Sequence, residues 1–125
     1  MILLLDTHVL LWWVADDARL GPQARALITD PANRVLISIV SLWEIAVKAR
    51  IGKLRADVDA VVHAAEADGM EHLALTTEHL RVLRDLPLHH RDPFDHALIA
   101  QAMAEGATLI SDDRWMASYG LAVVS

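Results

Sequence analysis

The sequence contains no cysteine, one tyrosine, one phenylalanine, five glycines and four prolines among its 125 residues. Without cysteine, disulfide bridges and thiolate metal sites are excluded, and a reducing compartment suits the chain. No linker, repeat or low-complexity segment divides it, so we expect one domain over residues 1–125. The hydrophobic fraction of 54% indicates a globular protein and excludes a disordered tail.

Hydrophobic runs long enough to cross a membrane are also missing. No apolar run approaches the roughly 18 residues that a spanning helix requires. The first residues, MILLLDTHVLLWWVA, are apolar, but they lack a basic segment and contain Asp6, unlike a signal peptide. We therefore expect a soluble protein of the cytoplasm with no membrane partner.

Basic residues are scarce, because 11 Lys and Arg stand against 17 Asp and Glu and give a net charge of −6. This balance argues against a protein that coats nucleic acid through its overall field. It does not exclude a nuclease, because a metal ion bound in an acidic pocket reverses the local sign of the charge.

Short apolar runs alternate with longer amphipathic or alanine-rich segments along the chain. Continuous apolar runs are typical of buried strands, which we expect at residues 1–5, 34–38, 71–76, 107–111 and 121–125. Helices are expected at residues 8–15, 20–28, 41–52, 57–69, 77–86, 94–105 and 112–120. This alternation predicts an α/β fold with a mostly parallel central sheet and helices on both faces.

Acidic residues recur where the predicted strands end or the following helices begin. Asp6 follows the first strand, Glu44 lies on the first expected turn after the second, and Asp95 lies on the first turn of the alanine-rich helix. Asp112 and Asp113 follow the fourth strand. Ligands of parallel sheets bind beyond these strand ends, and Mg²⁺ and Mn²⁺ prefer oxygen ligands. The pattern therefore predicts an acidic metal site.

Each of these residues also has a purely structural interpretation. Glu44 follows Ser41 by three positions, as in a capping box, and precedes Lys48 by four, as in a surface ion pair worth about 0.2–0.5 kcal/mol. Asp6 is suited to capping a helix, and one of Asp112 and Asp113 is needed to cap the helix that follows them.

The segment HHRDPFDHALIAQA, residues 89–102, contains two aspartates with different expected roles, one as a helix cap and one as a site residue. Asp92 precedes Pro93, so it is the natural N-cap of a helix in which Asp95 occupies the third position. Asp95 then shares a helical stripe with Leu98 and Ile99, which should face the sheet. An inward carboxylate needs a cation or hydrogen-bond donors, so Asp95 is expected to serve a site, with a capping box as the alternative.

Three blocks, in this order, resemble PIN domains and specifically VapC-type toxin ribonucleases. They are LLLDTHVLLWW, SIVSLWEIAVKARIGKL and LPLHHRDPFDHALIAQAMAEGATLISDDRWMASYG. The resemblance spans essentially the whole chain and implies an α/β/α sandwich with Mg²⁺- or Mn²⁺-dependent endoribonuclease activity on RNA. It also implies a homodimer that is held inactive by a cognate antitoxin.

The resemblance assigns the family's acidic residues to positions of this sequence. They fall on Asp6, Glu44, Asp95 and Asp113, and Ser111 is similar to the Ser or Thr that lines the family's pocket. Asp112 is a departure from the family pattern and leaves the fourth acidic position open between the two neighbours. The implied mechanism is attack on phosphorus by a water whose pKa a metal ion lowers.

Several other polar and aromatic residues admit two interpretations. Lys48 is expected either to pair with Glu44 or to touch a phosphate, and the basic stretch of residues 48–55 either guides RNA or is a solvated helix end. The pair His89–His90 lacks the further ligands that a zinc site needs. His8 and His96, next to proposed ligands, either hydrogen-bond to them or simply pack. The tryptophans, Trp12, Trp13, Trp43 and Trp115, are expected in the core or a protein interface.

Two other functions were weighed against a ribonuclease. A phosphorelay receiver has a similar length and an acidic pocket, but here the second strand ends in Ser38 rather than an acceptor Asp. No Lys follows the fourth strand either, which argues further against a receiver. A non-catalytic interaction module with the same fold is the remaining alternative.

Overall fold

The computed structural model describes residues 1–125 and contains one five-stranded, wholly parallel sheet with the strand order β3-β2-β1-β4-β5. The strands are β1 (Ile2–Leu5), β2 (Arg34–Ser38), β3 (Glu71–Leu73), β4 (Thr108–Ile110) and β5 (Val123–Val124). The helices are α1 (Thr7–Val14), α2 (Pro22–Thr29), α3 (Ile39–Arg50), α4 (Val58–Ala67), α5 (Thr77–Arg84), α6 (Pro93–Glu105) and α7 (Arg114–Ala117). The predicted α/β sandwich is confirmed.

The order in which the chain adds strands to the sheet reverses at β1, which lies between β2 and β4. In register, Leu4 of β1 pairs with Leu36 of β2 on one side and Leu109 of β4 on the other. The chain thus builds β2 and β3 on one side of β1 and β4 and β5 on the other. In open α/β sheets, ligands bind where the strand order reverses, beyond the carboxyl ends of the strands.

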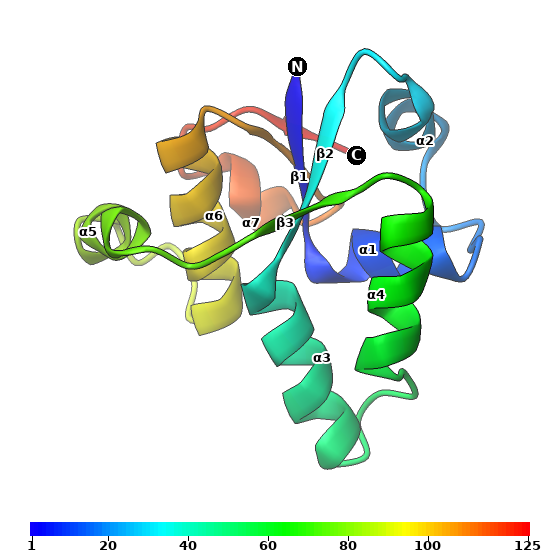
Figure 1. Cartoon of the computed structure of the whole chain (residues 1–125). Helices are drawn as coiled ribbons and strands as arrows, with labels where there is room; N and C mark the ends of the chain where they lie inside the picture. The colour runs from blue at the N-terminus through cyan, green and yellow to red at the C-terminus, as the bar shows by residue number, and fades with distance from the viewer.

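Alternating residues of β1 send side chains into two separate cores. Leu3 and Leu5 pack in one core with side chains of α1, α2 and α4, whereas Leu4 packs in the other with α6 and α7. Because all three leucines are fully buried, β1 has to be apolar on both faces. Figure 1 shows α1, α2 and α4 on one side of the sheet and α5, α6 and α7 on the other.

Aspartate side chains cap two helices at this edge of the sheet, one directly after β1 and one in the segment between α5 and α6. Asp6 caps α1 by accepting a hydrogen bond from the backbone N–H of Val9 at 2.8 Å. Asp92 caps α6, as predicted, and accepts from the N–H groups of Phe94 and Asp95. These caps fix the starts of α1 and α6 at the same end of the sheet, the lower end in Figure 1.

Helix α3 begins earlier than the sequence pattern indicated. Its N-cap is Ser38, the last residue of β2, whose Oγ accepts from the N–H of Val40 at 3.0 Å. Ser41 is therefore inside the helix, and its capping-box interpretation is wrong. Glu44 lies on the second turn, not the first, and both side chains are buried.

A buried polar network ties this end of the sheet to the opposite helices. The Ser38 hydroxyl donates to Oε1 of Gln101, whose amide nitrogen lies 3.4 Å from Nδ1 of His79. The other ring nitrogen of His79 lies 3.0 Å from a carboxylate oxygen of Glu105. Three separate segments, β2, α5 and α6, are joined in this way.

None of the helices combines the length and apolar character that crossing a membrane requires.

Candidate functional site

Four acidic side chains gather at the carboxyl end of the sheet and form what we call the carboxylate cluster: Asp6, Glu44, Asp95 and Asp113. Asp6 directly follows β1, Glu44 lies on α3 after β2, Asp95 lies on the first turn of α6, and Asp113 follows β4. Asp6 and Glu44 are each only 3% exposed. The predicted grouping of these residues at one end of the sheet is thus what the topology produces.

Asp6 is held by hydrogen bonds on both carboxylate oxygens. Oδ1 accepts from the N–H of Val9, and Oδ2 accepts from the hydroxyl of Ser111 at 2.5 Å. The Ser111 oxygen in turn accepts from the N–H of Asp113 at 3.1 Å. Burial raises the pKa of Asp6 to about 6, although the bonds from Ser111 and Val9 act in the opposite direction. Ser111 therefore orients one member of the cluster and positions the backbone of another.

Glu44 is fixed by one hydroxyl and one ammonium group. Its Oε1 accepts from Oγ1 of Thr7 at 2.6 Å, and Oγ1 of Thr7 also lies 3.1 Å from Oγ of Ser41. Its Oε2 contacts the Nζ of Lys48 at 2.5 Å, and this bond raises the pKa of Lys48. The pair was expected at the surface, but the Glu44 side chain is 4% exposed and that of Lys48 34%. The surface interpretation of this pair is wrong.

Asp95 carries the largest electrostatic perturbation of the cluster. Its side chain is 19% exposed, and it shares a helix face with Leu98 and Ile99, which are fully buried. Burial raises the pKa of Asp95 to about 8, and the negative charges of Asp92, Glu44, Asp6 and Asp113 add to this effect. At neutral pH the Asp95 carboxyl is therefore mostly protonated in the absence of a cation, and a bound cation would favour its ionised form.

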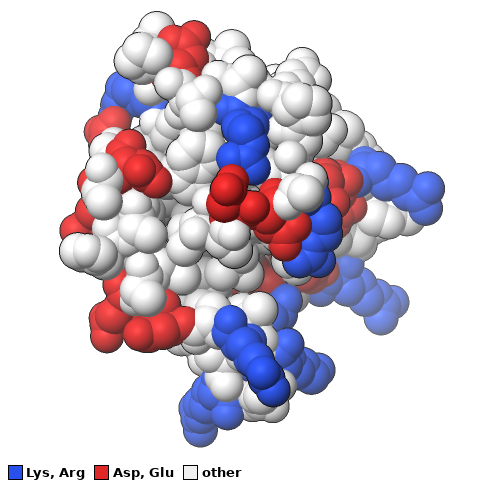
Figure 2. All heavy atoms as spheres, turned by 90° about the vertical axis from the view of Figure 1, so that its right-hand side faces the viewer, with Lys and Arg blue, Asp and Glu red and all other residues white.

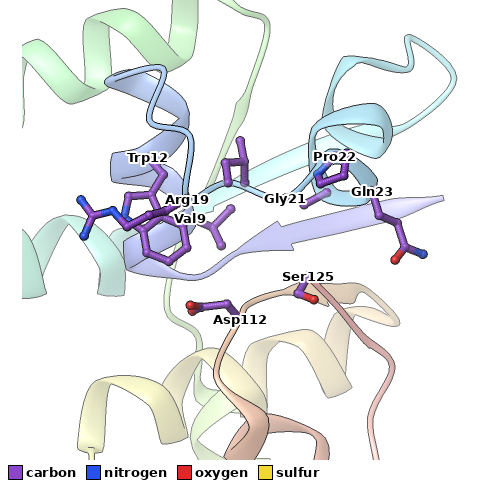
Figure 3. Close-up of a pocket in the computed structure, with 10 residues that line it drawn as sticks. Val9, Trp12, Arg19, Gly21, Pro22, Gln23, Asp112 and Ser125 are labelled. Carbon is purple, nitrogen blue, oxygen red and sulfur yellow. The ribbon is translucent and has the colours of Figure 1, made fainter.

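Asp113 and Asp112 have different surroundings although they are neighbours. Asp113 is half-buried and caps α7 through the N–H of Trp115 at 2.9 Å, and its charge acts on Asp95. Asp112 is exposed and lines a cavity of about 350 Å³ across from Trp12 and Arg19 (Figure 3). Its charge acts on Asp6 and on Arg19.

This difference predicts unequal effects of neutralising the two residues. Under the RNA-cleaving activity that the sequence resemblance implies, Asp113→Asn should lower cleavage by more than about 100-fold, since even groups that only orient metal ligands contribute about 10–100-fold. It should leave melting nearly unchanged, because Asn caps a helix as well as Asp does. Asp112→Asn should impair cleavage only mildly. Cleavage rates and thermal melting of both variants check this, and equal losses would contradict the assignment.

The donor chemistry of the cluster suits a hard divalent cation. All four members offer carboxylate oxygens, the type of ligand that Mg²⁺ and Mn²⁺ prefer. As the side chains stand, however, no group of three or more His, Cys, Asp or Glu is arranged to hold a metal ion. A cation would therefore be held by fewer than three of these side chains, or would draw them closer together. The assignment of metal ligands stays a prediction.

The other polar candidates are placed outside the cluster. His8 is exposed and stacks on Trp12, with ring centroids 6.1 Å apart. His96 contacts the hydroxyl of Tyr119 at 3.1 Å rather than a carboxylate. His89 also packs on Tyr119, with ring centroids 4.8 Å apart. His89 and His90 thus both contact Tyr119 and do not form a zinc site, and of the two only His90 also approaches the cluster, with Nε2 3.4 Å from Oδ2 of Asp95.

Two tryptophans lie outside the core. Trp43 is 55% exposed and Trp115 is 49% exposed, so for these two the core half of the expectation is wrong. Trp13 is half-buried and donates from Nε1 to Asp68 at 2.9 Å.

Sequence reasoning missed two groups of residues near the site. Thr7 was not singled out, although it directly follows Asp6 and its hydroxyl donates to Glu44. The contacts of Tyr119 with His90 were missed as well, because no periodicity links residues so far apart in the sequence. Only the position of Thr7 beside a proposed ligand offered a usable signal.

The whole-chain pattern of fold and site identifies the class of protein. The PIN domain family profile matches residues 3–120, so this chain belongs to the PIN domain family. The resemblance inferred from the three sequence blocks is thereby confirmed. A comparison with curated proteins finds no match.

Chains of VapBC structures are among the solved structures with the same fold. A chain of VapBC2 from Rickettsia felis, bound to a DNA fragment from the promoter, has 16% identity and a TM-score of 0.73, covering 99% of this chain and 98% of that one. A chain of DNA-bound VapBC from Salmonella typhimurium has 16% identity and a TM-score of 0.72, covering 99% and 97%. VapBC-1 from nontypeable Haemophilus influenzae gives 15% identity and a TM-score of 0.68, covering 100% and 98%. At these identities the likeness is one of fold.

Proposed function

We propose that this chain is a Mg²⁺- or Mn²⁺-dependent endoribonuclease that acts in the cytoplasm as the toxin of a toxin–antitoxin pair. The main support is the concentration of negative charge around Asp95, whose pKa burial and neighbouring carboxylates raise to about 8. A partly buried group perturbed in this way at the carboxyl end of a parallel sheet is typical of a functional site. Membership of the PIN family and the fold shared with VapBC complexes support the same proposal.

Different residues of the chain would have different roles in such a site. Asp6, Glu44, Asp95 and Asp113 would hold the cation, and Ser111 would keep Asp6 oriented through its hydroxyl hydrogen bond. The chemistry that Mg²⁺ or Mn²⁺ would supply at these residues is a lower pKa for a bound water and stabilisation of the leaving oxygen of a phosphodiester. In-line hydrolysis of RNA needs no covalent intermediate with the protein.

A basic segment beside the cluster supports an RNA substrate. Lys48 and Lys53 line a cavity of about 340 Å³ together with Glu44. Arg50 and Arg55 are exposed nearby in sequence. Figure 2 shows Lys and Arg side chains gathered at the lower end of the molecule, the level at which α3 ends in Figure 1. Although the net charge is −6, this local group of cations is suited to the phosphate backbone.

Protein partners belong to the proposal as well. A groove of about 470 Å³ between α1 and α4 is lined mainly by apolar side chains, among them Leu11, Trp12 and Val61. We assign this groove to a cognate antitoxin, in keeping with the VapBC complexes that share the fold. A homodimer is proposed too, and the exposed apolar residues Trp43 and Ile51 on and just after α3 are suited to such an association.

The proposal is tested by metal removal. The purified protein should cleave single-stranded RNA when Mn²⁺ or Mg²⁺ is present, and excess EDTA should reduce cleavage to background. Asp95→Asn, purified in the same way, controls for contaminating nucleases. Undiminished cleavage in EDTA would contradict the mechanism. A folded protein that binds a cognate antitoxin but cleaves no RNA would favour the non-catalytic interaction module.

A further inference from the structure

The hydroxyl of Tyr119 is surrounded by four nitrogen atoms that come from the segment before α6 and from α6 itself. The backbone N–H groups of His89 and His90 donate to it at 3.2 and 3.3 Å. Nδ1 of His90 lies 2.8 Å from it, and Nε2 of His96 lies 3.1 Å from it. Tyr119 is itself buried. The contacts of this one hydroxyl group thus connect Tyr119 to the segment before α6 and to α6 itself.

Hydrogen-bond counting at this hydroxyl, together with the contact distances, favours one tautomer of His90 over the other. A tyrosine hydroxyl has one proton to donate and two lone pairs that accept. The two backbone N–H groups can only donate, so the hydroxyl proton must go to a ring nitrogen. The shortest of the contacts, 2.8 Å, is that to Nδ1 of His90. With Nδ1 accepting, a neutral His90 ring carries its proton on Nε2.

That Nε2 atom is buried and faces the carboxylate cluster. It is the one buried side-chain nitrogen or oxygen in the structure without a hydrogen-bond partner. Nε2 of His90 lies 3.4 Å from Oδ2 of Asp95, and the His90 and Asp95 side chains are 14% and 19% exposed. No other histidine, lysine or arginine side chain comes as close to the Asp95 carboxyl group. A buried donor without an acceptor is costly, and a short movement of the Asp95 carboxylate would satisfy it.

We propose that His90 is a positioning residue: Tyr119 fixes its Nε2–H tautomer, and this N–H orients the Asp95 carboxylate for the cation. The inference rests on the proposed function, since it assigns Asp95 a cation to hold. Second-shell partners of this kind fix the orientation of metal ligands, and losing one weakens metal affinity or activity by about 10–100-fold. His89, whose ring packs on the edge of Tyr119, contacts no carboxylate of the cluster and has no such role.

The tautomer is read directly, without any activity measurement. In long-range ¹H–¹⁵N spectra of the ¹⁵N-labelled, metal-free protein at about pH 7.5, where free imidazole is mostly neutral, His90 should be protonated on Nε2 and not on Nδ1. The His90→Ala spectrum assigns its signals. Tyr119→Phe removes the hydroxyl and should abolish the preference for Nε2–H. A ring protonated on Nδ1, or on both nitrogens, would overturn the proposal.

The positioning role is read from Mn²⁺ binding by isothermal titration calorimetry. His90→Ala should weaken binding by about 10–100-fold. His90→Gln, whose amide can donate from nearly the same place, should recover part of the loss, and His89→Ala should bind as the wild type does. Excess Mn²⁺ should restore the cleavage rate of His90→Ala, which it would not do for a variant with a damaged fold.

Two failures are distinguished by the wild-type protein. If the wild type binds no Mn²⁺ and cleaves no RNA, the proposed function fails and the positioning role with it. If the wild type binds Mn²⁺ and His90→Ala binds it equally well, only the role of His90 is overturned.

Discussion

Asp95→Asn is expected to reduce RNA cleavage to background while making the metal-free protein more stable at neutral pH. The amide keeps the shape of the side chain but removes the charge that a cation needs, so we expect a loss of more than about 100-fold, beyond that of second-shell changes. Stability should rise because burial, and after it the neighbouring negative charges, raise the pKa of the wild-type carboxyl to about 8. A residue that lowers stability while serving a site is a known compromise.

The sign of the pH effect follows from the two pKa values. The Asp95 carboxyl has an ordinary pKa of 3.8 in the unfolded chain and about 8 in the folded one. Stability that comes from its protonated form is complete below about pH 4 and is lost as the pH rises through about 8. Asn does not titrate, so the variant should lack this loss. The Asp95→Asn variant should still show the smaller loss of stability with rising pH that Asp6 causes, because the pKa of Asp6 is raised to about 6.

The measurements are melting temperatures in EDTA from pH 4 to pH 9, with cleavage rates in Mn²⁺. Asp92 supplies the matched control, because it caps α6 from the same segment. Asp92→Asn should keep both the cap and the activity, whereas Asp92→Ala should cost about 0.5–2 kcal/mol of stability with activity largely retained. If Asp92→Asn loses as much activity as Asp95→Asn, the division between cap and ligand is wrong. If Asp95→Asn melts lower than the wild type at pH 7, the electrostatic account is wrong.

Expression of the wild-type protein alone in a bacterial host is expected to arrest growth. Unrestrained hydrolysis of RNA would remove transcripts that the cell needs, and the proposed antitoxin would be missing. Co-expression of the small reading frame beside the gene should restore growth, because its product would occupy the groove between α1 and α4. Colony counts and growth curves after induction give the result.

The control for this experiment is Asp95→Asn, which should accumulate as a folded protein without stopping growth. Arrest by both the wild type and the variant would indicate toxicity unrelated to the carboxylate cluster. Normal growth despite abundant, folded wild-type protein would count against the toxin function and in favour of an interaction module.

The elements of the fold could be predicted from the sequence because burial leaves a direct pattern. β1 is apolar on both faces since both of its faces are covered, and α6 has a cap at Asp92 and an αL residue at Gly106 that mark its ends. The start of α3 was harder to place, because Ser38 ends β2 and also caps the helix. A residue with two roles at a boundary cannot be assigned to one by periodicity.

The candidate site was predictable in its members but not in its internal contacts. The position of each acidic residue relative to a strand end is local information, and a parallel sheet brings those ends together. Which oxygen meets Thr7, Ser111 or His90 depends on how α1, β4 and the segment before α6 pack in three dimensions. The burial of the Glu44–Lys48 pair had the same origin, since i,i+4 spacing says nothing of what covers the pair.

The place of β1 at the centre of the sheet affects the order in which the protein is assembled during translation. β1, β2 and β3 are synthesised first and pair consecutively, so until β4 has been made β1 has one unpaired edge. Asp6 lies at the start of that order and Asp113 near its end. A nascent chain therefore carries only part of the carboxylate cluster until Asp113 has been synthesised. The proposed activity would then begin only after β4 and the segment that follows it have joined the sheet.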